Sequence, residues 1–363
     1  MTFVERAAQS VSKHFPGCVI ALVGAVAADR LAGFVPVLSG LLLALAFGIL
    51  LRVLGWVPWW AERGLRWCSR TPLYAGVALL GLHLVVDDLL FLGWQLLGAA
   101  VLVAYLALGA GLLAGRLLRT EASAPPLLVE GAAGGAYGHS RPGQKAPSGG
   151  RHDSGFVTVA SVSIGLLLTV ALLYAAEQGG GLLGGAASGE MSERCAIVAG
   201  LGLPHPALAA AALDLTAPIS SGEAGSMAAL ALAAAYVMVR AIALLPVLWA
   251  RGSARIGSRG NGSGGASGTA HDAPALSRTL VHSWYVAAFA AFALYRSVAG
   301  ISPDTEATTT AIISMLLSIG LLAWGASLSR PASWRSAGRE TLLALVVIVT
   351  SVSAGAAAVW MLS

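Results

Sequence analysis

Arg240 is the residue of this chain whose position most needs a chemical explanation. It lies within AAAYVMVRAIALLPVLWA, residues 233–250, which is otherwise uncharged, and the next basic residue, Arg251, follows eleven positions later. In a helix, eleven residues span about 16 Å, roughly half the hydrocarbon thickness of a bilayer. A guanidinium at that depth costs about 2.5–3.5 kcal/mol on insertion scales, so Arg240 requires partners that share its charge.

Two kinds of partner fit an arginine at this depth. The planar guanidinium matches the oxygens of carboxylate, sulfate or phosphate groups, so Arg240 is a candidate contact for a small anionic substrate. Alternatively, Arg240 has a structural role, as the ion-pair partner of Glu130 or as a donor to backbone carbonyls. The sequence leaves both interpretations open.

Two segments interrupted by glycine or proline are further candidates for a site. In GAAGGAYGHS, which ends at Ser140, Gly131 and Gly138 could offer backbone N–H groups to an anion at a half-helix start; a re-entrant turn without ligand is the alternative. In GLGLPHPALAA, which begins at Gly200, His205 is either a proton-coupling group or a histidine at the membrane interface. Irregular backbone at membrane depth is tolerated only against protein or a cavity, so both segments predict a binding site.

The composition defines the class of protein in which these residues lie. Hydrophobic residues make up 57% of the 363 residues, charged residues make up 11%, and the mean hydropathy is +0.78. Soluble domains carry about 25% charged residues, so we expect an all-α, polytopic membrane protein. The net charge of +5 lies mostly in loops, where the positive-inside rule accounts for it, and does not indicate nucleic-acid binding.

The sequence carries no signature of an enzyme or of a metal site. It has no HExxH, no GxSxG and no cluster of cysteine and histidine at metal-ligand spacing. The cysteines Cys18, Cys68 and Cys195 are far apart, and their odd number argues against a disulfide framework. We therefore expect no catalytic activity, no metal and no cofactor.

The apolar runs predict about nine to eleven transmembrane segments. Basic loops at 52–70 and 251–279 and acidic loops at 177–194 and 301–307 alternate well if the N-terminus is cytoplasmic. Two crossings, at 124–150 and 195–213, are uncertain. His83 is expected to hydrogen-bond a neighbouring helix, and Arg296 to extend to the interface. The runs fall at about 17–33, 35–57, 71–86, 89–115, 155–176, 195–213, 225–250, 280–300, 308–328 and 341–362, with a poorer one at 123–140.

An internal repeat links two distant parts of the chain. Residues 76–94 and 320–338 each open with Gly-x4-Gly-x-polar-Leu, and each then passes through a polar stretch to a further glycine and a long apolar helix. An odd number of crossings between the copies would make them face opposite ways, as in the inverted repeats of secondary transporters. Chance similarity between helices rich in glycine and leucine is the alternative.

The sequence resembles the sulfate-exporter (YeiH-like) family of bacterial inner-membrane proteins. The resemblance is clearest over FPGCVIALVGAVAADRL, VLSGLLLALAFGILL, TPLYAGVALLGLHLVVDDLLFLGW and AGLLAGRLL, in that order. It implies an inverted-repeat fold with broken helices. Of the family's motif positions this chain keeps Gly131, Gly138, Ser140, Gly200 and, with a one-residue shift, His205. The next helix keeps Arg240 and Pro246 but has Val237 in place of a lysine.

These observations predict one transmembrane domain over 1–363, with a flexible cytoplasmic linker at about 252–279, in the bacterial cytoplasmic membrane. The expected function is transport of a small anion by alternating access, with sulfate or a sulfonate implied by the resemblance alone. The expected partners are that anion, the lipid bilayer and a coupling proton or sodium ion; homo-oligomerisation stays open. The alternative is a relative that keeps the fold as a sensor or accessory subunit without transport.

Overall fold

The fold was analysed in a computed structural model of the chain. It describes residues 3–34, 39–85, 94–117, 196–201, 203, 205–216, 224–257, 284–327 and 334–362. Every regular element within these residues is a helix, which confirms the all-α prediction. The elements are α1 (Phe3–Ala32), α2 (Gly40–Val53), α3 (Glu62–Cys68), α4 (Thr71–Leu79), the 3-10 turn η1 (Leu80–His83), α6 (Trp94–Leu117), α10 (Pro206–Thr216), α11 (Ala224–Gly257), α13 (Trp284–Ala299), α14 (Pro303–Ala326) and α15 (Trp334–Leu362).

Four of the described helices are long and apolar enough to cross a membrane. These candidate spans lie in α1, α6, α11 and α14. The apolar run at 35–57 forms a shorter helix than predicted, because α2 has 14 residues and a rise of about 21 Å, less than the bilayer core. The expected runs at 123–140 and 155–176 lie outside the described residues, so the number of crossings stays a prediction.

The predicted linker begins later than expected. Helix α11 continues to Gly257, so the first residues of the segment 252–279 are helical. Ala254 and Arg255 favour a helix, and the single Gly252 does not end one whose other residues support it. Residues 258–279 lie outside the part of the chain that the structure describes.

The glycines that align in the internal repeat make reciprocal contacts. A Cβ added to Gly76 on α4 would lie 3.1 Å from Leu317 on α14, and one added to Gly320 on α14 would lie 2.7 Å from Leu73 on α4. Leu73 precedes Gly76 by three positions, as Leu317 precedes Gly320. Leu73 thus meets Gly320, and Gly76, further along α4, meets Leu317, which comes earlier in α14. The two helices therefore pack in an antiparallel sense.

The second pair of repeat glycines shows the same exchange. Gly81 in η1 lies against the backbone of α13 at Phe289, and Gly325 in α14 lies against the backbone of α2 at Leu45. Phe289 follows Leu45 by the same 244 positions that separate Gly325 from Gly81 (289 less 45, 325 less 81). Helix α13 is therefore the counterpart of α2, which extends the repeat beyond the segment that the sequence aligned.

Two ion pairs also obey this equivalence. Arg52 Nη1 lies 2.9 Å from Glu62 Oε1 where α2 gives way to α3, and Arg296 Nη2 lies 3.4 Å from Glu306 Oε2 where α13 gives way to α14. Ten positions separate the partners in both pairs. Arg296 and Glu306 follow Arg52 and Glu62 by the same 244 positions. Each copy thus closes the same helix–helix corner with the same charges.

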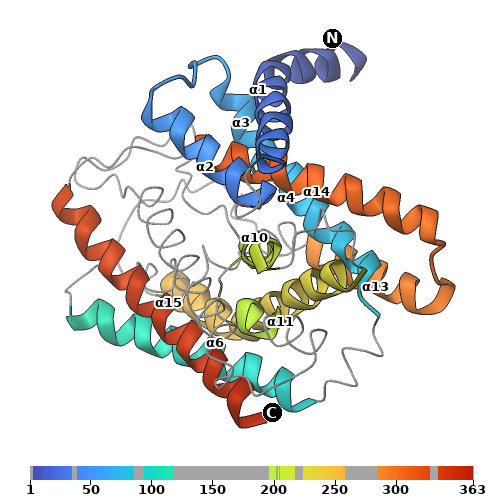
Figure 1. Cartoon of the computed structure of the whole chain (residues 1–363). Helices are drawn as coiled ribbons and strands as arrows, with labels where there is room; N and C mark the ends of the chain where they lie inside the picture. The colour runs from blue at the N-terminus through green and yellow to red at the C-terminus, as the bar shows by residue number, and fades with distance from the viewer. Residues whose placement is uncertain are drawn as a thin grey trace.

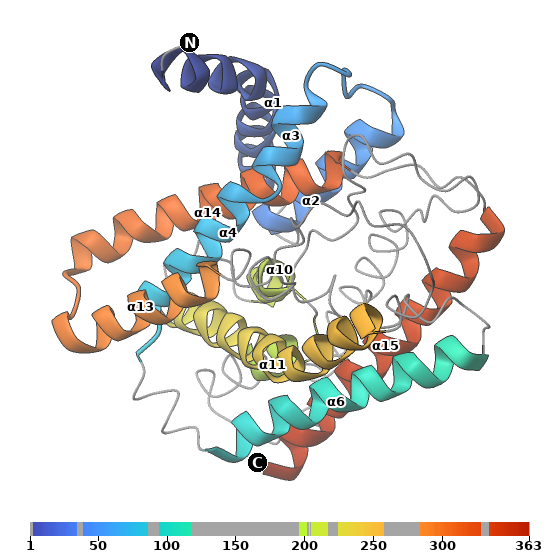
Figure 2. The same ribbon diagram turned by 180° about the vertical axis from the view of Figure 1, so that it is seen from behind.

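The two copies are related by an approximate two-fold axis. The first copy comprises α2, α3, α4, η1 and α6, and the second comprises α13, α14 and α15; α6 packs along α15, as Figures 1 and 2 show from opposite sides. The single helix α14 corresponds to α3 and α4 together, because Pro72 lacks an N–H and interrupts the first copy. Antiparallel packing of equivalent helices agrees with the predicted inverted repeat.

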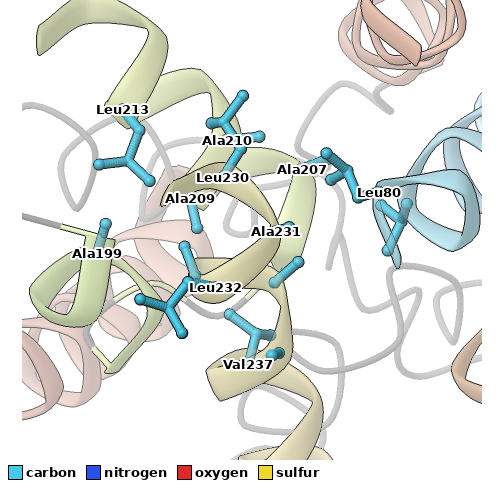
Figure 3. Close-up of a cluster of buried hydrophobic side chains, with 14 of the residues drawn as sticks. Leu80, Ala199, Ala207, Ala209, Ala210, Leu213, Leu230, Ala231, Leu232 and Val237 are labelled. Atoms are coloured by element: carbon cyan, nitrogen blue, oxygen red, sulfur yellow. The ribbon is translucent and has the colours of Figure 1, made fainter. Parts of the chain in front are cut away.

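Helices α10 and α11 form the centre of the fold. In Figure 1, α10 lies near the middle of the molecule with the repeat helices around it. The apolar window of α11 is 76% buried, against 28–44% for the windows of the other three candidate spans, so α11 is an inner helix. Small side chains line its contacts with α10 and with residues 196–201; Figure 3 labels Ala199, Ala207, Ala209, Ala210 and Ala231 among them.

Candidate functional site

The helix that precedes α10 is broken at the place where the sequence predicts a site. Residues 196–201 are helical, His205 lies in a bend, and α10 starts at Pro206. Pro206 has no N–H, so it is well suited to the first position of a new helix. The break leaves the carbonyls at the end of 196–201 without N–H donors further along the helix, so these carbonyls need donors from elsewhere.

Arg240 supplies those donors. Its Nη1 donates to the carbonyl oxygen of Leu201 and, at 3.2 Å, to that of Leu203. Its Nη2 lies 3.5 Å from the hydroxyl oxygen of Ser351 on α15, and this hydroxyl donates in turn to Val347 O. The sequence left open whether Arg240 meets an anion, Glu130 or backbone carbonyls, and the structure shows the carbonyl contacts. The break in one helix and the charge in another therefore explain each other.

The charge of Arg240 is not matched by a carboxylate within the described residues. Its side chain is buried, with 8% of the residue exposed, and its hydrogen-bond partners among the described residues are carbonyl and hydroxyl oxygens. Its Nε has no hydrogen-bond partner among the same residues. A buried guanidinium whose partners carry only partial charges favours the approach of an anion. Glu130, the ion-pair candidate from the sequence, lies outside the described residues.

His205 is buried beside this break. Only 3% of the residue is exposed, and its ring centroid lies 6.3 Å from that of Tyr74 on α4 and 6.0 Å from that of Trp324 on α14. Its Nδ1 accepts the N–H of Ala207 at 3.1 Å, so the proton of the neutral imidazole is on Nε2. The ring packs inside the protein, between α4 of the first repeat copy and α14 of the second. Whether His205 is a proton-coupling group or a histidine at the membrane interface stays a prediction.

The start of α10 is already capped by the same residue. The carbonyl oxygen of His205 accepts the N–H groups of Leu208 and Ala209, and its ring accepts that of Ala207. These amides would otherwise be available to an anion at a half-helix N-terminus. In the state described here the first amides of α10 are therefore engaged within the chain.

Gly200 has a packing role in the same segment. A Cβ added to it would lie 2.7 Å from the carbonyl oxygen of Ala233 and 3.0 Å from the Cβ of Tyr236, both on α11. The absence of a side chain brings the helical residues 196–201 onto α11, one turn before Arg240. Gly131, Gly138 and Ser140, the other predicted contacts, lie outside the described residues.

Asp214 is a buried polar residue that the sequence analysis did not select. It lies near the end of α10 with 5% of the residue exposed, and its Oδ2 accepts the N–H of Leu41 at 3.4 Å. The Ser39 hydroxyl caps the next amide, that of Leu42, at 3.1 Å. A carboxylate at a helix N-terminus is favoured by the helix dipole, so Asp214 ties α10 to the first helix of the repeat. A single acid directly after an apolar run was the signal available in the sequence.

His83 lies at a second polar cluster, away from Arg240. Its Nε2 lies 3.3 Å from the Thr309 hydroxyl on α14, which confirms the predicted hydrogen bond to a neighbouring helix. Its Nδ1 lies 3.7 Å from Glu306, the residue that pairs with Arg296. Arg296 also donates to the carbonyl oxygen of Ile301 at 3.4 Å, so it holds the turn between α13 and α14. Its predicted extension to the membrane interface stays a prediction.

The fold and the site define an α-helical membrane protein with two related helix sets around a broken helix and a buried arginine. Residues 16–137 match the family model described as Conserved hypothetical protein 698. Over 119 residues the chain is 29% identical to a UPF0324 membrane protein of Corynebacterium glutamicum, and the match covers 33% of this chain and 34% of that protein's length. No solved structure matches. The similarity thus covers most of α1 and the first repeat copy.

Proposed function

We propose that this protein is a secondary transporter of a small anion in the bacterial cytoplasmic membrane, and that it is a member of the family whose model matches its first third. The supporting observation is the buried guanidinium of Arg240, which has carbonyl and hydroxyl partners and no carboxylate within the described residues. The substrate class, sulfate or a sulfonate, follows from the resemblance to sulfate exporters. The N-terminus is cytoplasmic in this proposal.

The transport cycle would use the break that Arg240 holds closed. An anion that binds Nε and Nη2 offers full negative charge where the carbonyls offer partial charge, so it competes for the guanidinium. Release of the Leu203 carbonyl, the longer of the two carbonyl contacts, would let the segment between 201 and 206 move. The repeat copies on either side of this segment supply two related arrangements, as alternating access requires. The coupling ion is a proton or sodium.

A second function, that of a sensor or accessory subunit without transport, is supported by one specific observation. The donors that would serve an anion are engaged within the chain: Nη1 of Arg240 binds two carbonyls, and the first amides of α10 are capped by His205. An arginine kept only to cap a broken helix would look the same. The experiment therefore has to separate anion binding from helix stabilisation.

The test is thermal unfolding of the purified full-length protein in nanodiscs with sulfate, methanesulfonate, phosphate and chloride. A ligand at ten times its dissociation constant stabilises the folded state by about 1.4 kcal/mol, which is readily measured. We expect an oxyanion to raise the unfolding temperature of the wild type and not that of Arg240→Gln. Arg296→Gln is the matched control, because it removes an arginine whose partner is a carboxylate, and it should keep the anion response.

Uptake of radiolabelled sulfate or sulfonate into proteoliposomes then separates the two functions. Anion binding with transport supports the transporter, whereas binding without transport supports a sensor. An equal anion response in the wild type and in Arg240→Gln would refute the role of Arg240. No response to any anion would leave only the capping role.

A further inference from the structure

Two cysteines far apart in the sequence are in contact. Cys18 lies in α1 and Cys68 is the last residue of α3, fifty positions later, and their Sγ atoms are 3.0 Å apart. Both are free thiols, and their spacing in the sequence does not suggest a pair. Thiols at this separation need only a small movement to reach covalent distance, which is about 2.0 Å.

A glycine contact between the two helices holds the thiols together. A Cβ added to Gly17 would lie 2.6 Å from the Cα of Gly64, so neither position has room for a side chain and the backbones of α1 and α3 touch. Cys18 directly follows the first glycine, and Cys68 lies one helical turn after the second, on the same face. The thiols are therefore placed by rigid backbone contact, not by flexible side chains.

The surroundings give the thiols different roles. Cys18 is partly exposed, whereas only 1% of Cys68 is exposed, within a cluster that includes Ala61 and Leu65. Burial raises the pKa of the Cys68 thiol, and its hydrogen bond with Cys18 raises it further. The thiolate is the nucleophile in thiol–disulfide exchange, so Cys18 reacts first with a reagent from solvent and Cys68 reacts second, from inside.

We propose that Cys18 and Cys68 form a reversible redox modification site that closes as a disulfide by exchange with a low-molecular-weight disulfide. The Cys18 thiolate attacks one sulfur of that disulfide, which forms a mixed disulfide and releases one thiolate. The Cys68 sulfur, after losing its proton, attacks the Cys18 sulfur and expels the second thiolate. The two protein thiols are oxidised, the small disulfide is reduced to two thiols, and the two protons go to the released thiolates.

The closed disulfide would fasten α1 to α3. Helix α1 also packs on α2 and α14, so the link fixes α1 at the corner where the two repeat copies meet. The low thiolate content of Cys68 is offset because its attack is intramolecular, and oriented groups reach very high effective concentrations. The site is separate from Arg240 on α11, and it does not depend on the proposed transport.

The test uses full-length protein in nanodiscs with Cys195→Ala, which leaves Cys18 and Cys68 as its cysteines. The reduced protein is treated with 4,4′-dithiodipyridine, which releases coloured thiopyridone at each exchange step. We expect two thiopyridones per chain, an intact mass about 2 Da below that of the reduced protein, and full reversal by dithiothreitol. Proteolysis should yield one linked peptide pair that contains both cysteines.

Single variants serve as controls. With Cys68→Ala, the reagent should release one thiopyridone and stay bound to Cys18 as a mixed disulfide; with Cys18→Ala, reaction of the folded protein should slow at least tenfold. The mass measurement on the parent protein does not depend on whether these variants fold. A stable adduct on the parent, or no reaction until the protein is unfolded, would overturn the proposal.

Discussion

The contact between α2 and α14 offers a sharp test of the repeat. In Gly325→Ala the new Cβ would lie 2.7 Å from the carbonyl oxygen of Leu45 and 2.9 Å from the N of Ile49, whereas ordinary contact begins at 3.4 Å. Both obstacles are backbone atoms, so no side chain can rotate away. The helices must separate by about 0.7 Å, the difference between 3.4 and 2.7 Å, to admit one methyl group.

The cost follows from the contacts that such a separation weakens. At optimal separation each pair of heavy atoms attracts by about 0.1–0.2 kcal/mol, and a gap of about 0.5–1 Å removes about a quarter to a half of that energy. With about 50 atom pairs across the interface, the expected loss in unfolding free energy is about 1–5 kcal/mol, which spans the range known for overpacked cores. Gly81→Ala should cost a similar amount, because Gly81 meets the backbone of α13 in the equivalent way.

The assay is equilibrium unfolding in mixed detergent micelles, with Gly98→Ala as the matched control. A Cβ at Gly98 on α6 meets nothing within 4 Å, so this variant should be neutral or gain up to about 1 kcal/mol from helix propensity. The double variant Gly81→Ala with Gly325→Ala should lose the sum of the single losses, since the two contacts are separate. If Gly325→Ala proves as stable as Gly98→Ala, the close approach of α2 and α14 is refuted.

Three further predictions concern the polar groups. Asp214→Asn should lower the unfolding free energy by about 1 kcal/mol, because the Leu41 amide loses a charged acceptor; thermal unfolding against Asp214→Ala, which should lose more, checks this. Arg52→Glu or Glu62→Arg alone should lower the unfolding free energy by less than about 1 kcal/mol, because the paired side chains are 26% and 42% exposed. The double variant, which restores the pair with its charges exchanged, should recover most of that loss. In 1 M salt the difference between the single and double variants should disappear. The rate of closure of the α1–α3 disulfide should rise about tenfold per pH unit between pH 7 and 9. Closure needs the thiolate of Cys68, and the raised pKa of this thiol keeps it mostly protonated in that range, so the thiolate fraction grows tenfold with each unit. A rate of thiopyridone release that does not depend on pH would contradict the proposed order of attack.

The sequence predicted the class of fold and one half of its symmetry. The hydrophobic periodicity and the composition were sufficient to predict apolar helices. The spacing of Gly76 and Gly81 was sufficient to align their segment with that of Gly320 and Gly325, because helices that approach this closely require glycine whatever the surrounding residues are. The match of α2 with α13 was not predicted. The partner surfaces there are backbone atoms, which place almost no constraint on sequence.

The candidate site was predicted in its residues but only partly in its contacts. Arg240 and the break before His205 both stood out, since an intramembrane charge and a proline-flanked histidine are rare. That Arg240 binds the carbonyls of the break could not be read from the sequence, because carbonyl acceptors occur at every residue. The pairing of Cys18 with Cys68 was missed for a related reason: it depends on how α1 lies on α3, and the glycines that set this are indistinguishable from the many others.

The alanines between α10 and α11 have a consequence for motion. An alanine side chain has no rotamers, so docking the alanines of α10 freezes almost no side-chain conformational entropy. For the same reason, these alanines cross no torsional barrier when α10 is displaced along α11. The contact surface combines these methyl groups with larger side chains, among them Leu213, Leu230 and Leu232. The alanines thus leave the position of α10 to be fixed by these leucines and by the polar groups at its two ends. His205 packs near Tyr74 and Trp324, and Asp214 accepts the Leu41 N–H.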